Sequence, residues 1–212
     1  MAAGTPWTIT PLVTDFSVPG LALGHCSLGD TGVTTIVSTD GAGALGAVDV
    51  RGGGPGTRET DLLDPHNSVE RVHAVVLSGG SAFGLAAADG AMRELESRGI
   101  GFPVFGEGNP GPRVPIVPAA VIFDLIVGDS NHRPGAEDGA AAIRAAFDGT
   151  AGDRSGTVGA GCGALAGALR GGFGRAQTTV KSADGQIEYI VAAAVVANPL
   201  GSPIDSATGR FY

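Results

Sequence analysis

The chain is poor in positive charge and in cysteine. Its 212 residues include one lysine, Lys181, and carry a formal net charge of −8. Phosphate backbones are bound by clustered basic side chains, so this composition argues against a nucleic-acid surface. Two cysteines, Cys26 and Cys162, are too few for a disulfide framework and indicate a reducing compartment. We therefore expect a cytoplasmic protein.

Long apolar runs, a leader sequence and metal-ligand spacings are also missing. No segment approaches the run of about 18 apolar residues that a membrane span needs. The first twenty residues have no basic segment followed by an apolar one, so we expect no secretory leader. The cysteines form no C-x-x-C pair, and the histidines at 25, 66, 73 and 132 show no i, i+4 pairing. We expect no metal site and no cofactor.

Apolar residues and glycine are abundant. Hydrophobic residues make up 43% of the chain and charged residues 16%, which is enough for one large core, so we expect a single domain over residues 1–212. The 37 glycines gather in "RGGGPG" (51–56), "SGGSAFG" (78–84), "GTVGAGCGALAG" (156–167) and "RGGFG" (170–174). Such clusters indicate tightly shaped loops between apolar segments.

The apolar pattern predicts many strands and two helices. The helices are expected at 81–98, followed by Gly99 as a C′ residue, and at 134–149. The strands are expected at 21–27 and 32–39 (a hairpin), 43–50, 71–78, 117–127, 174–180 and 187–199, the last of these long and buried. This order is typical of a layered α+β or α/β domain.

Ser81 follows a predicted strand and opens a predicted helix, where a hydrolase could place a nucleophile. A nucleophile elbow needs glycine two residues before and two residues after its serine. Gly79 meets the first requirement, but Phe83 fails the second, and His132 offers only a thin triad. We therefore predict that Ser81 caps the helix, whose free N–H groups could line an oxyanion site.

Three other stretches allow two interpretations each. Gly161, Gly163 and Ala166 match G-x-G-x-x-A, but the preceding residues are loop-like, so the dinucleotide pattern is weak. The loop 51–65 is either tied by surface ion pairs or forms the wall of a polar pocket. Asn198, before Pro199, either ends a strand or supplies an amide to a developing oxyanion.

Five motifs, taken in order, resemble one family. "RGGGPGTRETDLLDP", "LSGGSAFGLAAADG", "VPIVPAAVIFDL", "GTVGAGCGALAGALRGGFG" and "AAAVVANPLG" are similar to stretches of the DmpA-type aminopeptidases. That family includes L-aminopeptidase/D-esterases, β-peptidyl aminopeptidases and nylon-oligomer hydrolases. The resemblance implies a four-layer αββα sandwich made by a precursor that cuts itself into a larger α chain and a smaller β chain.

This chain resembles the α chain, so the resemblance places the nucleophile elsewhere. The new N-terminal Ser or Thr of the β chain, expected beyond Tyr212, would attack the substrate, with its own α-amine as base. The implied partners are that β chain, a small peptide or amide substrate, and further copies in a homo-oligomer of αβ units.

The resemblance also implies roles for individual residues. Asn198 matches an asparagine that supplies an oxyanion-hole amide, and Arg170 lies where relatives often place a lysine near the nucleophile. Phe123 lies where several relatives carry a tyrosine, whose hydrogen bond a phenyl ring cannot donate. Gly80 and Ser81 would shape the substrate pocket. Two alternatives stay open: acyl transfer of the ornithine acetyltransferase kind, and a non-enzymatic glycine-rich ligand-binding domain.

Overall fold

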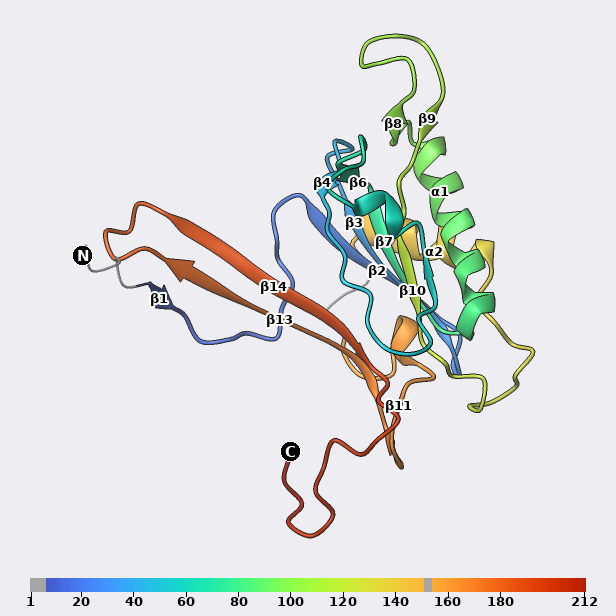
Figure 1. The fold of residues 1–212 in the computed structure, drawn as a ribbon, viewed down its shortest axis with the longest axis vertical. Coiled ribbons are helices and arrows are strands. Elements are labelled where there is room, and N and C mark those ends of the chain that lie inside the picture. Colours follow the sequence, from blue (N-terminus) through green and yellow to red (C-terminus); the bar gives the residue numbers. More distant parts are fainter. Residues whose placement is uncertain (1–6, 151–153) are drawn as a thin grey trace.

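A mixed five-stranded sheet forms the centre of the computed structural model, which describes residues 7–150 and 154–212 (Figure 1). β7 and β10 are parallel, and every other neighbouring pair in this sheet is antiparallel. In spatial order its strands are β2 (Leu21–Ser27), β3 (Gly32–Ser38), β7 (Ala74–Ser78), β10 (Ala119–Val121) and β5 (Thr57–Arg58).

Some of the strands predicted from the sequence are confirmed and others are not. The β2–β3 hairpin is confirmed almost to the residue, whereas the segment 71–78 is divided at His73 into β6 (Arg71–Val72) and β7. β6 pairs with β4 (Ala44–Leu45), the only part of predicted strand 43–50 that forms a ladder. The predicted strand 117–127 is mostly wrong, because the chain leaves the ladder after Val121 and turns at a buried aspartate.

Helices α1 (Ala87–Ser97) and α2 (Ala136–Phe147) cover one face of the sheet. A 3₁₀ segment, η2 (Ser81–Ala86), leads into α1, so the predicted helix is confirmed in extent but begins with tighter turns. The predicted capping by the Ser81 side chain is wrong: the N-cap residue is Gly80, which has no side chain of its own to cap the helix. The core beneath the helices consists of alanine and larger aliphatic side chains, among which Val33, Val76, Leu95 and Ile143 are fully buried.

A second sheet meets the other face of the first at one end only. Its long hairpin is β13 (Gly172–Lys181) and β14 (Glu188–Ala197), with β1 (Thr8–Ile9) added at the edge of β13. Only the base of the hairpin packs on the body, through the cluster of Leu23, Val158 and Phe173, and the rest extends away (Figure 1). The prediction that 187–199 is buried is therefore wrong: β14 is exposed over residues 188–191 and alternates between half-buried and exposed residues over 192–197.

The layers are thus helices, a five-stranded sheet and a three-stranded sheet, which confirms the α+β class. Two short ribbons complete the described strands: β8 (Phe102–Pro103) with β9 (Arg113–Val114), and β11 (Leu165–Ala166) with β12 (Leu169–Arg170). Single 3₁₀ turns form at η1 (Asp61–Leu63) and η3 (Gly159–Gly161). Over the described ranges, no helix has the length and apolar character to span a bilayer.

The two helices touch through their backbones, and this contact generates a stability prediction. A Cβ added to Gly139 would overlap the carbonyl oxygen of Ala87, and one added to Gly90 would overlap that of Ala136. Gly139→Ala should lower the free energy of unfolding by about 1–3 kcal/mol, because overpacking outweighs the gain in helix propensity. Urea denaturation measures the change. Gly53→Ala, whose Cβ would meet nothing within 4 Å, is the control; equal midpoints for the two variants would contradict the packing argument.

His25 makes the fold sensitive to acid. Its Nδ1 lies 2.9 Å from Thr34 Oγ1, and its Nε2 is buried without a hydrogen-bond partner among the described residues. Burial, followed by the charges of Arg175 and Arg154, lowers the pKa of His25 to about 4. The folded ring stays neutral while the unfolded one gains a proton, so stability should fall as the pH drops from about 6.5 to 4. Urea midpoints across this range should fall less steeply for His25→Gln; equal slopes would be inconsistent with this cause.

Candidate functional site

The candidate site forms where the carboxyl ends of β7 and β10 meet. These strands are parallel with Val121 opposite Ser78, so the segments that follow them leave the sheet at the same edge. The Ile122 N–H donates to the Ser78 carbonyl over 2.9 Å, and the Ser81 N–H donates to the Ile122 carbonyl over 3.0 Å. Two turns more than 40 residues apart in sequence are therefore joined by backbone hydrogen bonds.

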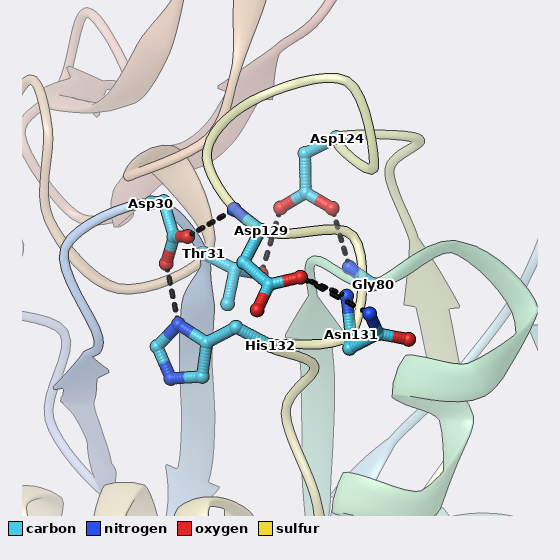
Figure 2. A network of polar contacts seen from close by, with 7 residues as sticks. All are labelled: Asp30, Thr31, Gly80, Asp124, Asp129, Asn131 and His132. Carbon is cyan, nitrogen blue, oxygen red and sulfur yellow. Dashed lines mark hydrogen bonds and ion pairs between the residues drawn. The ribbon is translucent and has the colours of Figure 1, made fainter.

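The carboxylate of Asp124 holds this edge together (Figure 2). Asp124 is only 2% exposed, and its two oxygens accept hydrogen bonds from the Gly80 N–H over 2.6 Å and from Thr31 Oγ1 over 2.7 Å. A Cβ on Gly79 or Gly163 would overlap the same carboxylate, so glycine is required at both positions. The sequence analysis missed Asp124, whose signal was an acid placed at the end of an apolar run.

A second acid ties the loop after Asp124 to the β2–β3 turn. Asp30 Oδ1 lies 2.6 Å from His132 Nδ1, and its Oδ2 accepts from the Asp129 N–H over 3.1 Å (Figure 2). Burial alone would raise the pKa of Asp30, but the hydrogen bonds from His132 and Asp129 bring it below its ordinary value. His132 is thus occupied with Asp30, and within the described residues it makes no hydrogen bond to Ser81.

Asn198 connects the end of β14 to the same edge. Its Oδ1 accepts from the Leu165 N–H over 2.8 Å, and its Nδ2 donates to the Phe123 carbonyl over 3.2 Å. Phe123 itself presents its ring to solvent, 56% exposed. The structure therefore brings Asn198 and Phe123 into direct contact although 75 residues separate them.

Arg170 lies on β12, directly across from Leu165 on β11. One guanidinium nitrogen lies 3.4 Å from the Cys162 carbonyl, and the side chain makes no ion pair within the described part of the chain. Arg170 and Asn198 are therefore both attached to the β11–β12 ribbon. The five residues singled out from the sequence thus belong to one connected region, with Gly80 and Ser81 joined to it through the segment 122–124.

The turn before α1 has an unusual backbone. Gly80 and Ser81 both have positive φ, +79° and +54°, and apart from Ser81 only Glu59 among the described non-glycine residues shares this property. A serine in the left-handed region is strained by about 1 kcal/mol or more, so the surrounding contacts must impose this geometry. Beside the turn, the Arg133 guanidinium lies 3.7 Å above the exposed ring of Phe83.

The model of peptidase family S58 matches residues 12–209. The chain belongs to this family. It is 50% identical to an uncharacterized aminopeptidase of Mycobacterium leprae, over 93% of this chain and 55% of that protein. It is 32% identical to a 6-aminohexanoate-oligomer endohydrolase of Kocuria, over 92% of this chain and 50% of that protein. The chain thus spans about half the length of these curated relatives.

A solved structure agrees with the family assignment at the level of fold. The L-aminopeptidase D-Ala-esterase/amidase of Ochrobactrum anthropi, reported as a new variant among the Ntn hydrolase fold, superposes with a TM-score of 0.68. The match covers 88% of this chain and 53% of that one, at 18% sequence identity. The S58 chain therefore has the fold of this Ntn hydrolase variant.

The glycine-rich stretch 156–167 packs against β2, β3 and β13 in the S58 chain. The N–H groups of Gly159 and Ala160 bond Ser27 Oγ and Thr34 Oγ1, and a Cβ on Gly161 would overlap the Phe173 nitrogen. The stretch forms one 3₁₀ turn followed by β11, and not the opening of an α-helix that a dinucleotide fingerprint needs. Across residues 7–150 and 154–212, no three His, Cys, Asp or Glu side chains are grouped to hold a metal ion.

The structure confirms the ion-pair interpretation of the loop 51–65, whereas the wall of a polar pocket stays a prediction. Arg51 pairs with Asp49 at 2.5 Å, and Arg58 pairs with Asp89 on α1, so surface ion pairs do tie it down. The same loop also lines a cavity of about 410 Å³ that reaches Val121 at the end of β10.

The Asp124 carboxylate yields a prediction about stability. In Asp124→Asn the new amide offers one acceptor oxygen in place of two, so either the Gly80 N–H or the Thr31 O–H loses its acceptor in a buried place. Asp124→Asn should reduce the free energy of unfolding by about 1.5–3 kcal/mol, as expected for hydrogen bonds to a charged group. Urea denaturation is the measurement. Asp129→Asn, on the same loop but exposed, is the control; an Asp124 variant as stable as this control would show that the carboxylate does not hold the edge.

Proposed function

We propose that this S58 chain supplies the pocket walls and an oxyanion donor of an N-terminal-nucleophile amide hydrolase. The observation that carries the proposal is the position of the Asn198 amide. An asparagine NH₂ group has two N–H donors. One donates to the Phe123 carbonyl, and the other has no acceptor among the described residues. Because Oδ1 is held by the Leu165 N–H, the group is oriented in advance and its second N–H can serve a substrate oxygen.

The attacking hydroxyl belongs, in this proposal, to the N-terminal Ser or Thr of a β chain cut from the same precursor. An α-amine has a pKa near about 8, so close to neutral pH a part of it is unprotonated and can accept the hydroxyl proton. The hydroxyl oxygen bonds to the amide carbon, the carbonyl oxygen becomes an oxyanion, and the leaving amine receives the proton. Water then hydrolyses the acyl-enzyme.

Arg170 and Phe123 set the character of the pocket. Arg170 brings a guanidinium to the β11–β12 ribbon, to which the Asn198 oxyanion donor is also bonded. The exposed Phe123 ring offers an apolar surface without a hydroxyl, so in this proposal Asn198 is the side-chain donor to the oxyanion. Gly80 and Ser81 form the adjoining wall, held by Asp124.

The substrate class follows from the relatives. Their names describe an aminopeptidase and an endohydrolase of 6-aminohexanoate oligomers, which both break amide bonds. We propose small peptides or amino-acid amides as substrates, a homo-oligomer of αβ units as the working assembly, and a cytoplasmic location.

Asn198 gives the sharpest kinetic prediction. Asn198→Asp keeps the oxygen that accepts from Leu165 but loses both N–H donors. We expect kcat for an amino-acid amide to fall by about 10²–10³ with little change in KM, as for the loss of one oxyanion donor. Asn109→Ala removes an asparagine that donates to a backbone carbonyl on an exposed loop, and should leave kcat unchanged. A variant of Asn198 that is equally stable and retains full kcat would exclude this role.

Self-cleavage is tested by mass spectrometry of the purified gene product. Two polypeptides should be found, the smaller beginning with Ser or Thr. A single uncut chain with full amidase activity would contradict the proposed nucleophile. Efficient acetyl exchange between acetylornithine and glutamate, without amide hydrolysis, would favour acyl transfer instead.

A further inference from the structure

A cavity of about 790 Å³ lies at the end of the central sheet opposite to the Gly80 turn. It is bordered by the loop 40–42, the segment 68–73 and the residues that follow α1. In Figure 1, β4, β6 and the β8–β9 ribbon mark this end, and β11 marks the other. The five residues of β7 separate the two ends by about 17 Å, at 3.3 Å per residue. The volume is in the range of small-molecule sites.

His73 provides an unused donor in the wall of this cavity. The residue is only 4% exposed, and its Nδ1 accepts a hydrogen bond from the Ile116 N–H over 3.0 Å. Because Nδ1 accepts from a backbone N–H it carries no proton, so the ring proton is on Nε2. Burial, and then the charge of Arg113, lower the pKa of His73. Nε2 has no partner among the described residues and is not sealed from solvent. His73 is one of the residues that border the cavity, and its Nε2–H has no acceptor in the described part of the chain.

Arg71 adds a cationic donor from the same segment. One guanidinium nitrogen donates to the Gly43 carbonyl over 2.7 Å, and no carboxylate of the described residues forms an ion pair with it. The two other arginines of the cavity are occupied, Arg98 by Glu94 and Arg113 by Glu107. The free donors are therefore the remaining Arg71 N–H groups and His73 Nε2–H, a combination that suits a carboxylate.

The acids of the cavity determine what else the ligand carries. Asp40 and Glu70 also line it; Asp40 accepts from Ser38 and Ala42, whereas Glu70 makes no hydrogen bond or ion pair to the described residues. Repulsion from these two negative charges disfavours the binding of a multiply charged anion such as phosphate, and repulsion from Arg71 disfavours the binding of a simple cation. A ligand with one charge of each sign satisfies both sides.

We propose that this cavity binds a small zwitterion, a free amino acid or a short peptide. Its carboxylate is held by Arg71 and His73 Nε2–H, and its ammonium group lies toward Glu70. The proposal is independent of the hydrolytic function, since it uses none of the residues at the Asn198 edge.

Calorimetric titration of the protein with five probes tests the proposal: glycine, glycylglycine, acetate, ethylamine and inorganic phosphate. Glycine or glycylglycine should bind more tightly than each of the other three, and the stronger of the two identifies the ligand length. Arg71→Gln should weaken this binding by at least about tenfold, as expected when a charge-assisted hydrogen bond is lost. Arg93→Gln, an exposed arginine on α1 outside the cavity, should leave it unchanged.

The ring ¹⁵N and Nε2–H signals of His73 locate the binding in the unmodified protein. They should shift on addition of the bound zwitterion, and this readout stands even where Arg71→Gln folds poorly. The proposal is overturned by the absence of binding at millimolar probe, by phosphate binding more tightly than glycine and glycylglycine, by unchanged binding in Arg71→Gln, or by His73 signals that do not move.

Discussion

A buried carboxylate organises the edge of the sheet that forms the candidate site. A lone carboxylate in a protein interior is strongly disfavoured unless hydrogen bonds replace its water. Asp124 obtains them from a backbone N–H at the start of a helix and from the hydroxyl of Thr31, which come from different parts of the chain. The helix terminus favours the negative charge as well. This side chain therefore fixes the Gly80 turn against the segment 122–124, together with the backbone hydrogen bonds of Ile122.

The same logic extends along the edge. Asn198 joins β14 to the backbone of Phe123 and to the β11–β12 ribbon through a single amide. Residues remote in sequence are thus held by hydrogen bonds whose donors and acceptors are already oriented. Catalysis by fixed dipoles depends on this property, because little reorganisation is then needed when charge develops. Membership of family S58 and the fixed orientation of the Asn198 amide both support the proposed hydrolase.

Local pattern was sufficient for elements that are stabilised locally. The β2–β3 hairpin and α2 could be located because alternation, turn residues and helix propensity agree there. It was insufficient where tertiary contacts decide. The chain leaves the ladder after Val121, where Asp124 bonds Thr31 and Gly80. β14 is exposed because only the base of its hairpin meets the body. Neither contact is visible in a window of neighbouring residues.

The site shows the same division. The motifs identified Asn198, Phe123, Arg170 and the Gly80–Ser81 turn as residues of interest, and the structure connects them. The sequence could not reveal that Asp124 links two of these segments, because its hydrogen-bond partners are distant in the chain and a single acid after an apolar run does not identify them. The sequence also assigned Ser81 a capping hydroxyl, whereas in the structure the N-cap is Gly80 and Ser81 is the first residue of η2.

The backbone contact between α1 and α2 has a mechanical consequence. Where side chains separate two helices, changes of rotamer can accommodate a small displacement of one helix. Where glycines bring the main chains into contact, no side chain is present to adjust. Gly24 on β2 makes a similar contact with the Ala142 carbonyl of α2. The central sheet, α2 and α1 are therefore packed backbone against backbone, and we expect them to move as one rigid unit. The Gly80 turn, which leads into α1, is attached to this unit.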